Sequence, residues 1–167
     1  MNRQWRIALA MLLALALLGI AACSDDDTTT PTPGTPWRGN WLSADGNVAP
    51  LLASLLNIDS VRVTFNADLT VALAIHDTVT HQWSYNTGTY SVNPDQVNGI
   101  HAITTSYSSP AYEQAGIVKV VSDTPDTLKL EVVQTVPDIG AVPRTPQTGF
   151  GSDPLLLNSN IQIYVRE

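Results

Sequence analysis

The sequence has one cysteine, Cys23, so no disulfide can form within the chain. Basic residues are also few, with 8 Lys and Arg against 15 Asp and Glu, which gives a net charge of −7. An excess of negative charge argues against nucleic acid and against an anionic membrane surface as partners. The folded part must therefore be stabilised by an ordinary hydrophobic core, without disulfides.

Motifs of catalysis are missing as well. A serine hydrolase would carry Gly-x-Ser-x-Gly at a strand-to-helix turn. Residues 149–153 read Gly-Phe-Gly-Ser-Asp instead, with Pro154 next and no helix pattern after it. The sequence has no phosphate-binding glycine loop and no dinucleotide fingerprint. We therefore expect a protein that is not an enzyme and that needs no cofactor.

The three histidines raise the question of a metal site. His76 and His81 flank an expected hairpin turn, and His101 lies on a later expected strand. Zinc needs three or four converging ligands, usually with carboxylate or thiolate help. His76 alternates with the apolar residues around it and so faces away from them. Solvated histidines are the favoured interpretation, and we expect no metal.

The N-terminus has the layout of a secretory signal. Arg3 and Arg6 precede an apolar run of 14 residues, 7–20, which Ala21-Ala22-Cys23 closes. A membrane-spanning helix is the alternative, but it needs about 20 apolar residues. The Ile20-Ala21-Ala22-Cys23 ending resembles the lipobox of bacterial lipoproteins. That resemblance implies removal of residues 1–22, acylation of Cys23, and attachment to a membrane through the lipid.

The residues after the signal form an expected tether, 23–36, between the lipid and the domain 37–167. Loss of Arg3 and Arg6 with the signal leaves six basic residues against 15 acidic ones, a net charge of −9. The tether is rich in Thr and Pro and has no apolar side chain to bury after Cys23. Its Ser24-Asp25-Asp26-Asp27 run resembles the acidic signal that sends Bacteroidetes lipoproteins to the cell surface. We expect the protein to be attached to the outer membrane, either on its periplasmic face or at the cell surface.

From Trp37 onward the hydrophobic pattern has a period of two, which is typical of half-buried strands. About eight antiparallel strands are expected, at 39–43, 61–66, 69–76, 83–92, 99–107, 116–121, 127–136 and 160–166. Asn93-Pro94-Asp95 is expected to end the fourth strand. Leucines at helical spacing in 48–57 predict a short helix after the first strand. The Pro- and Gly-rich loop 137–158 is long enough to suggest a functional or covering role.

Several short motifs are similar to those of lipocalin-like lipoprotein domains of Gram-negative bacteria. They are Gly39-Asn40-Trp41, Phe65-Asn66-Ala67-Asp68-Leu69-Thr70, Trp83 with Tyr85, Gly88-Thr89-Tyr90, and Asp126-Thr127-Leu128. The chain departs from that family in having Leu69 where the first hairpin usually has glycine. The resemblance implies an antiparallel meander that closes into a roughly eight-stranded lipocalin-like barrel.

The aromatic residues are the best functional lead in the sequence. Trp83 and Tyr85 share one face of a strand, and at the mouth of a barrel their rings could stack on a ligand. An eight-stranded barrel holds either packed side chains or one small ligand. We expect a small apolar ligand in the interior, with Trp83 and Tyr85 as candidate contacts. The alternative is an adhesion or accessory module that docks a protein or glycan through its outer surface or the 137–158 loop.

The lipoprotein hypothesis depends on one sulfur atom. Replacement of Cys23 by serine should abolish incorporation of labelled palmitate and release the protein from the membrane fraction, because serine has no thiol for the lipid. Metabolic labelling and membrane fractionation measure both effects. A Cys23→Ser variant that stays in the membrane and still takes up palmitate would contradict the hypothesis.

Overall fold

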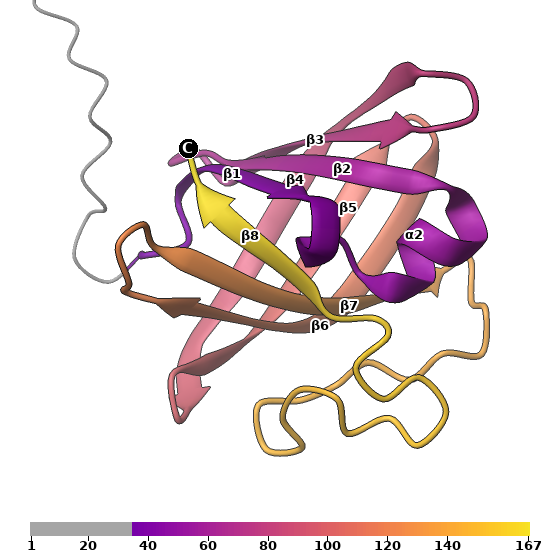
Figure 1. Cartoon of the computed structure of the whole chain (residues 1–167). Coiled ribbons are helices and arrows are strands. Elements are labelled where there is room, and N and C mark those ends of the chain that lie inside the picture. Colours follow the sequence, from indigo (N-terminus) through magenta and orange to yellow (C-terminus); the bar gives the residue numbers. More distant parts are fainter. Residues whose placement is uncertain (1–34) are drawn as a thin grey trace, which may run out of the picture. The chain divides into compact units, whose positions relative to one another are not determined.

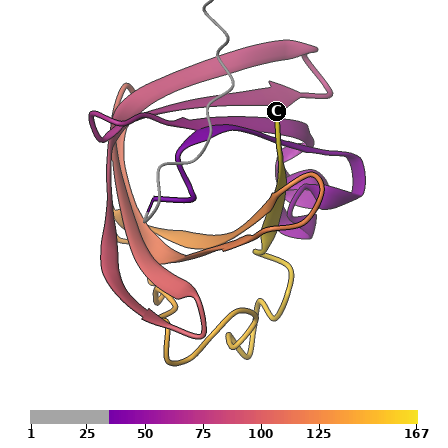
Figure 2. The ribbon, with the colours of Figure 1, turned by 90° about the vertical axis from the view of Figure 1, so that its left-hand side faces the viewer.

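The alternating segments of the sequence form eight antiparallel strands connected in chain order (Figure 1). This computed structural model describes residues 35–167, so the expected signal 1–22, Cys23 and most of the tether lie outside the described residues. The strands are β1 (Gly39–Ala44), β2 (Ile58–Phe65), β3 (Thr70–Asp77), β4 (Gln82–Val97), β5 (Ile100–Ser108), β6 (Ala111–Val121), β7 (Thr127–Val136) and β8 (Gln162–Arg166). Because β8 pairs with both β7 and β1, the meander closes into the predicted barrel (Figure 2).

Several predicted strand boundaries are wrong: β2 begins at Ile58 and β6 at Ala111, earlier than the predicted 61 and 116. Asn93-Pro94-Asp95 does not end β4, which continues to Val97. The pairing between β4 and β5 shifts register between Val92 and Gln96, so the proline falls where the ladder is already irregular. A bulge thus absorbs the residues that the sequence pattern marks as a break.

Glycine allows two neighbouring strands to approach closely where the sheet curls. Gly88 on β4 lies opposite Tyr107 of β5, and a Cβ added there would overlap the carbonyl oxygen of Ser106. Gly116 on β6 is in the same situation against the carbonyl oxygen of Glu131. Strongly bent barrel walls commonly use glycine in this way.

A 3₁₀ turn (η1, Asp45–Asn47) and a short helix (α2, Pro50–Leu56) connect β1 to β2, as the leucine spacing predicts. Pro50 occupies the first helical turn, where its missing N–H costs nothing. Asn57 ends the helix in the left-handed conformation, with φ of 55°. Among residues 35–167, no helix has the length and apolar character needed to cross a membrane.

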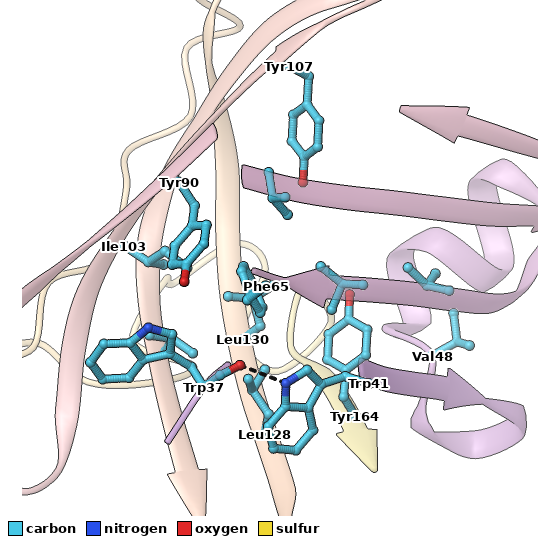
Figure 3. Packing of buried hydrophobic residues seen from close by; sticks show 14 of the residues in the cluster. Trp37, Trp41, Val48, Phe65, Tyr90, Ile103, Tyr107, Leu128, Leu130 and Tyr164 are labelled. Atoms are coloured by element: carbon cyan, nitrogen blue, oxygen red, sulfur yellow. Dashed lines mark hydrogen bonds between the residues drawn. The ribbon is translucent and has the colours of Figure 1, made fainter. Parts of the chain in front are cut away.

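The barrel is closed at the end where β1 begins and β8 finishes. Trp41 is fully buried there, and its indole Nε1 donates to the Trp37 carbonyl oxygen at 2.7 Å (Figure 3). The Arg166 guanidinium lies 4.1 Å from the centre of the Trp41 ring. It also donates to the carbonyl oxygens of Pro36 and Arg38 and to the Asp126 carboxylate, at 2.7, 2.8 and 2.9 Å. These bonds fix the start of the described chain to the end of the last strand.

Aromatic side chains fill the interior above this closure. Phe65 and Tyr90 pack edge to face, with ring centroids 4.9 Å apart. Ile103 and Leu128 are almost completely buried around them (Figure 3), and Val118 is buried in the same core cluster. These side chains pack together next to the closed end, whereas other members of the same core cluster, such as Ile58, Val61 and Val63, line a cavity.

We expect Arg166→Met to lower the free energy of unfolding by about 2–4 kcal/mol, because two partly buried carbonyl oxygens and a carboxylate lose their donor and the Trp41 ring loses its cation. Urea denaturation followed by tryptophan fluorescence measures the change. Arg62→Met is the matched control: its side chain is 53% exposed, and it too combines an ion pair, to Glu167 at 3.4 Å, with a stacked indole, Trp83. Its loss should cost less than about 1 kcal/mol. Equal effects of the two substitutions would contradict the role assigned to Arg166.

Candidate functional site

A cavity of about 540 Å³ occupies the other half of the barrel. It lies between β2, the end of β3, the β5–β6 hairpin, the second half of β7 and β8, with α2 beside it. Leu56 and Ile139 line the cavity and are 56% and 62% exposed, so they mark its mouth. The remaining apolar lining comes from Ala49, Leu51, Leu52, Ile58, Val61, Val63, Phe65, Leu73, Ile75, Leu130, Val132, Val133, Ala141 and Leu156.

Three tyrosines bring hydroxyl groups into this apolar space. Tyr107 and Tyr112 stack with ring centroids 4.6 Å apart, and the hydroxyls of Tyr107 and Tyr164 both point into the barrel interior (Figure 3). Burial raises the pKa of all three phenols, and the neighbouring tyrosines add to the rise at Tyr107 and Tyr164. All three therefore remain protonated and uncharged at neutral pH.

Amides and one hydroxyl complete the polar lining, at Thr105, Gln114, Gln134, Asn160 and Gln162. Thr105 donates to Gln114 Oε1 at 3.3 Å, and Gln134 Nε2 donates to the Pro137 carbonyl oxygen at 3.0 Å. None of the residues that line the cavity is Asp, Glu, His, Lys or Arg. The cavity can thus enclose a largely apolar molecule and form hydrogen bonds with a polar group on it. None of its side chains would pair with a charged group.

Helix α2 closes part of the mouth through its leucines. Leu51, Leu52 and Leu56 line the cavity, whereas Leu55 is exposed. The helix is tied down at its start, where the Leu51 amide donates to the Ser159 carbonyl oxygen at 2.9 Å. The helix therefore lies at the mouth as a partial cover and not as a plug in the interior.

A gap in the strand ladder is filled by the segment after β7. Pairing of β7 with β8 ends at Leu130 and Gln162, although β7 continues to Val136. Asn160 Nδ2 donates to the Val132 carbonyl oxygen at 2.9 Å, and the Gly151 amide donates to the buried Glu131 carboxylate at 2.8 Å. The long loop predicted at 137–158 is therefore part of the cavity wall.

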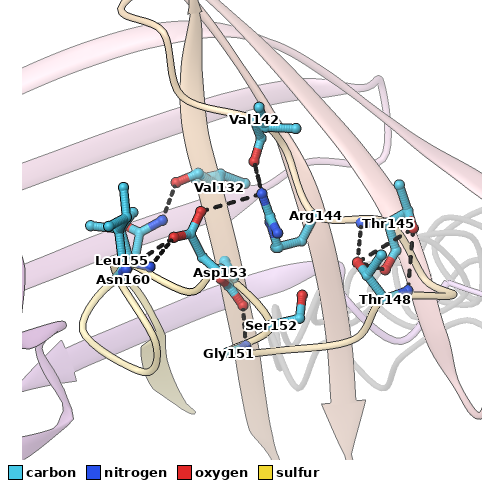
Figure 4. A network of polar contacts seen from close by, with 12 residues as sticks. Val132, Val142, Arg144, Thr145, Thr148, Gly151, Ser152, Asp153, Leu155 and Asn160 are labelled. Carbon is cyan, nitrogen blue, oxygen red and sulfur yellow. Dashed lines mark hydrogen bonds and ion pairs between the residues drawn. The ribbon is translucent and has the colours of Figure 1, made fainter.

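One ion pair organises this loop (Figure 4). Asp153 Oδ1 accepts hydrogen bonds from the amides of Leu155 and Leu156 at 2.8 and 3.0 Å, and its Oδ2 lies 3.3 Å from Arg144 Nη2. The Leu156 and Leu155 amides, and then the Arg144 charge, lower the pKa of Asp153. Arg144 also donates to the Val142 carbonyl oxygen, two residues before it, and its ion pair with Asp153 joins the two halves of the loop.

The residues proposed from the sequence as ligand contacts, Trp83 and Tyr85, do not line the cavity. Trp83 is paired with His76 across β3 and β4, its ring lies 5.1 Å from the His76 ring, and the Arg62 guanidinium lies over it. Tyr85 is 73% exposed. Both side chains are on the outer face of the barrel, the opposite face from Leu73 and Ile75.

The histidines are separate from one another. His76 Nδ1 lies 2.7 Å from Asp59 Oδ1, and His101 Nδ1 lies 2.9 Å from the Asn93 carbonyl oxygen. Within residues 35–167, no group of three or more His, Cys, Asp and Glu side chains is arranged to hold a metal ion. The cavity is consequently the strongest candidate site in the described part of the chain.

The sequence analysis missed the tyrosines and glutamines of the cavity, although a signal for them exists. Tyr107 lies two residues after Thr105 and four after Ile103, so all three side chains point to the same, buried face of the strand. Tyr164 lies two residues after Gln162 and shares its face in the same way. Comparisons of the chain with protein-family models, with curated proteins and with solved structures give no match.

Replacement of Asp153 by alanine should loosen the loop but leave the barrel folded. We expect the Leu155 and Leu156 amides to lose protection in hydrogen exchange measured by NMR. Because the pKa of Asp153 is lowered in the folded protein, its contribution is complete above about pH 4 and is lost as pH falls further. The wild type should therefore show the same loosening only in acid. Asp123→Ala, at an exposed turn, is the control, and equal exchange in both variants would contradict this assignment.

Proposed function

We propose that this chain is an envelope lipoprotein whose lipocalin-like barrel binds a small apolar ligand in its interior, and that it acts as a binding protein and not as an enzyme. The observation that carries the proposal is the cavity of about 540 Å³. Pockets for small molecules measure roughly 300–1,000 Å³ and combine apolar walls with a few polar groups. An eight-stranded barrel without a ligand site would have this space filled by side chains.

The apolar wall supplies the binding energy in this proposal. Burial of a methylene group contributes about 0.8 kcal/mol, so a ten-carbon chain gains roughly 8 kcal/mol before the costs of association are subtracted. Even a cost of about 4 kcal/mol leaves only about 4 kcal/mol, a millimolar dissociation constant, so contacts beyond a ten-carbon chain must add to the affinity. The tyrosines and amides then distinguish one apolar molecule from another by its polar group.

The location in the proposal rests on the N-terminal sequence. Cys23 follows a short apolar run and small residues, and residues 23–36 have the composition of a tether. Attachment through a lipid would keep the barrel at the outer membrane, on the periplasmic face or at the cell surface. The membrane contact is then the lipid and not the acidic protein surface.

A second function is favoured by one observation on the loop. Val142, Leu155 and Leu157 are 65%, 91% and 58% exposed and do not line the cavity. Exposed apolar residues gathered on a single segment are typical of surfaces that contact another protein. The adhesion or accessory module that the sequence left open would use this loop, with the barrel as its scaffold.

The ligand hypothesis can be tested with N-phenyl-1-naphthylamine, a neutral dye that fluoresces in apolar surroundings. The ring of strands and its core are complete within residues 35–167, so we expect this segment to fold when produced alone. It should bind the dye at one site per molecule, with micromolar affinity. A fluorescence titration that shows no saturable binding would contradict the proposal and favour the module.

Filling the cavity should prevent binding. Val132→Trp places a large ring system in the cavity, and we expect it to weaken dye binding at least about tenfold while the protein stays folded. Val79→Trp is the matched control, because Val79 is 68% exposed in the β3–β4 turn. Tyr85→Ala should also leave binding unchanged. Equal effects of Val132→Trp and Val79→Trp would place the dye elsewhere on the protein.

A further inference from the structure

Gln162 stands out among the cavity residues because half of its amide has no partner. Its Oε1 accepts the Ala49 backbone amide at 2.8 Å, and this bond fixes which way the side-chain amide faces. Its Nε2 is buried and has no hydrogen-bond partner, although the residue is only 5% exposed. Buried N–H groups are almost always paired, so an unpaired one in a cavity wall calls for an acceptor.

The cavity also sets a limit on the charge of its ligand. None of its lining residues is acidic, basic or a histidine, and its three phenols are protonated at neutral pH. An ion placed there would lose its water without gaining an opposite charge, which is strongly unfavourable. A ligand with a carboxylate or ammonium group inside the barrel does not suit this lining.

The burial of Gln162 contrasts with the exposed rim of the cavity. Leu56 and Ile139 form an exposed apolar rim at the mouth, whereas Gln162 and Tyr164, two residues apart on the inner face of β8, are buried. Gln162 and Tyr164 thus offer buried polar groups, and Leu56 and Ile139 offer apolar contacts at the rim. A molecule that satisfies both has its polar end at the buried groups and its apolar part toward the rim.

From these observations we infer that the cavity selects an uncharged amphiphile, an apolar chain or ring system that ends in an oxygen acceptor such as an alcohol, ester or ketone. Gln162 Nε2 donates a hydrogen bond to that oxygen. The inference rests on the proposed function and adds to it the chemical class of the ligand.

Three ligands of equal chain length test the inference, namely decan-1-ol, decanoate and decane, each used to displace N-phenyl-1-naphthylamine from residues 35–167. At pH 8 we expect decanol to bind about three- to tenfold more tightly than decane, and at least about tenfold more tightly than decanoate. The disadvantage of decanoate should shrink below about pH 5, where the carboxyl group is protonated. Decanoate binding as tightly as decanol at pH 8, or decane matching decanol, would overturn the inference.

Gln162→Met tests the assigned donor. We expect it to remove the preference for decanol over decane, because methionine fills similar space without an N–H. Gln134→Met is the matched control, since Gln134 also lines the cavity but its Nε2 already has a partner, the Pro137 carbonyl oxygen. That variant should keep the preference. If Gln162→Met weakens decanol and decane equally, the side chain acts only through the structure and the assignment is wrong.

The proposed function and the inferred ligand class are contradicted by different results. If the dye and all three ligands fail to bind, the proposed ligand-binding function is wrong. If the dye and decane bind but the head group makes no difference, the function survives and only the inferred ligand class is wrong.

Discussion

The barrel depends on the seam between its first and last strands. Only two positions pair β1 with β8, Trp41 with Arg166 and Leu42 with Val165, so backbone hydrogen bonds alone give a weak closure. Side chains strengthen it: Arg166 lies over the Trp41 ring and binds two carbonyl oxygens and one carboxylate around it. Sheet closure removes exposed strand edges. The interior space exists only while this seam holds the ring of strands together.

The same short last strand explains why the barrel is packed at one end and hollow at the other. β8 has five residues and β7 has ten, so the far part of β7 is paired with β6 on one side but has no strand on the other. Helix α2 and the loop after β7 take that place, and they meet through the bond from the Leu51 amide to the Ser159 carbonyl oxygen. Irregular backbone fits less closely than a strand. The space that remains is lined by aliphatic side chains, three phenols and a few amides.

The sequence was sufficient for the strands, their order and the helix, because alternation and leucine spacing are local properties. It was insufficient at Asn93-Pro94-Asp95, where a bulge lets the strand continue. Trp83 and Tyr85 were placed on the wrong face. Tyr90 on the same strand is buried in the barrel, and because side chains alternate along a strand, Trp83 and Tyr85 point to the outer face. The cavity itself depends on how far α2 and the loop stand from the strands, which no local pattern specifies. The lipid on Cys23 remains a prediction.

The described chain begins at the closed end of the barrel, where Arg166 binds the Pro36 carbonyl oxygen, and the mouth is at the opposite end. Whatever precedes residue 35 is therefore joined to the body at the pole farthest from the opening. A force applied to the chain before residue 35 would therefore be borne first by the hydrogen bonds of Arg166 to the Pro36 and Arg38 carbonyl oxygens, at the end of the barrel away from the mouth.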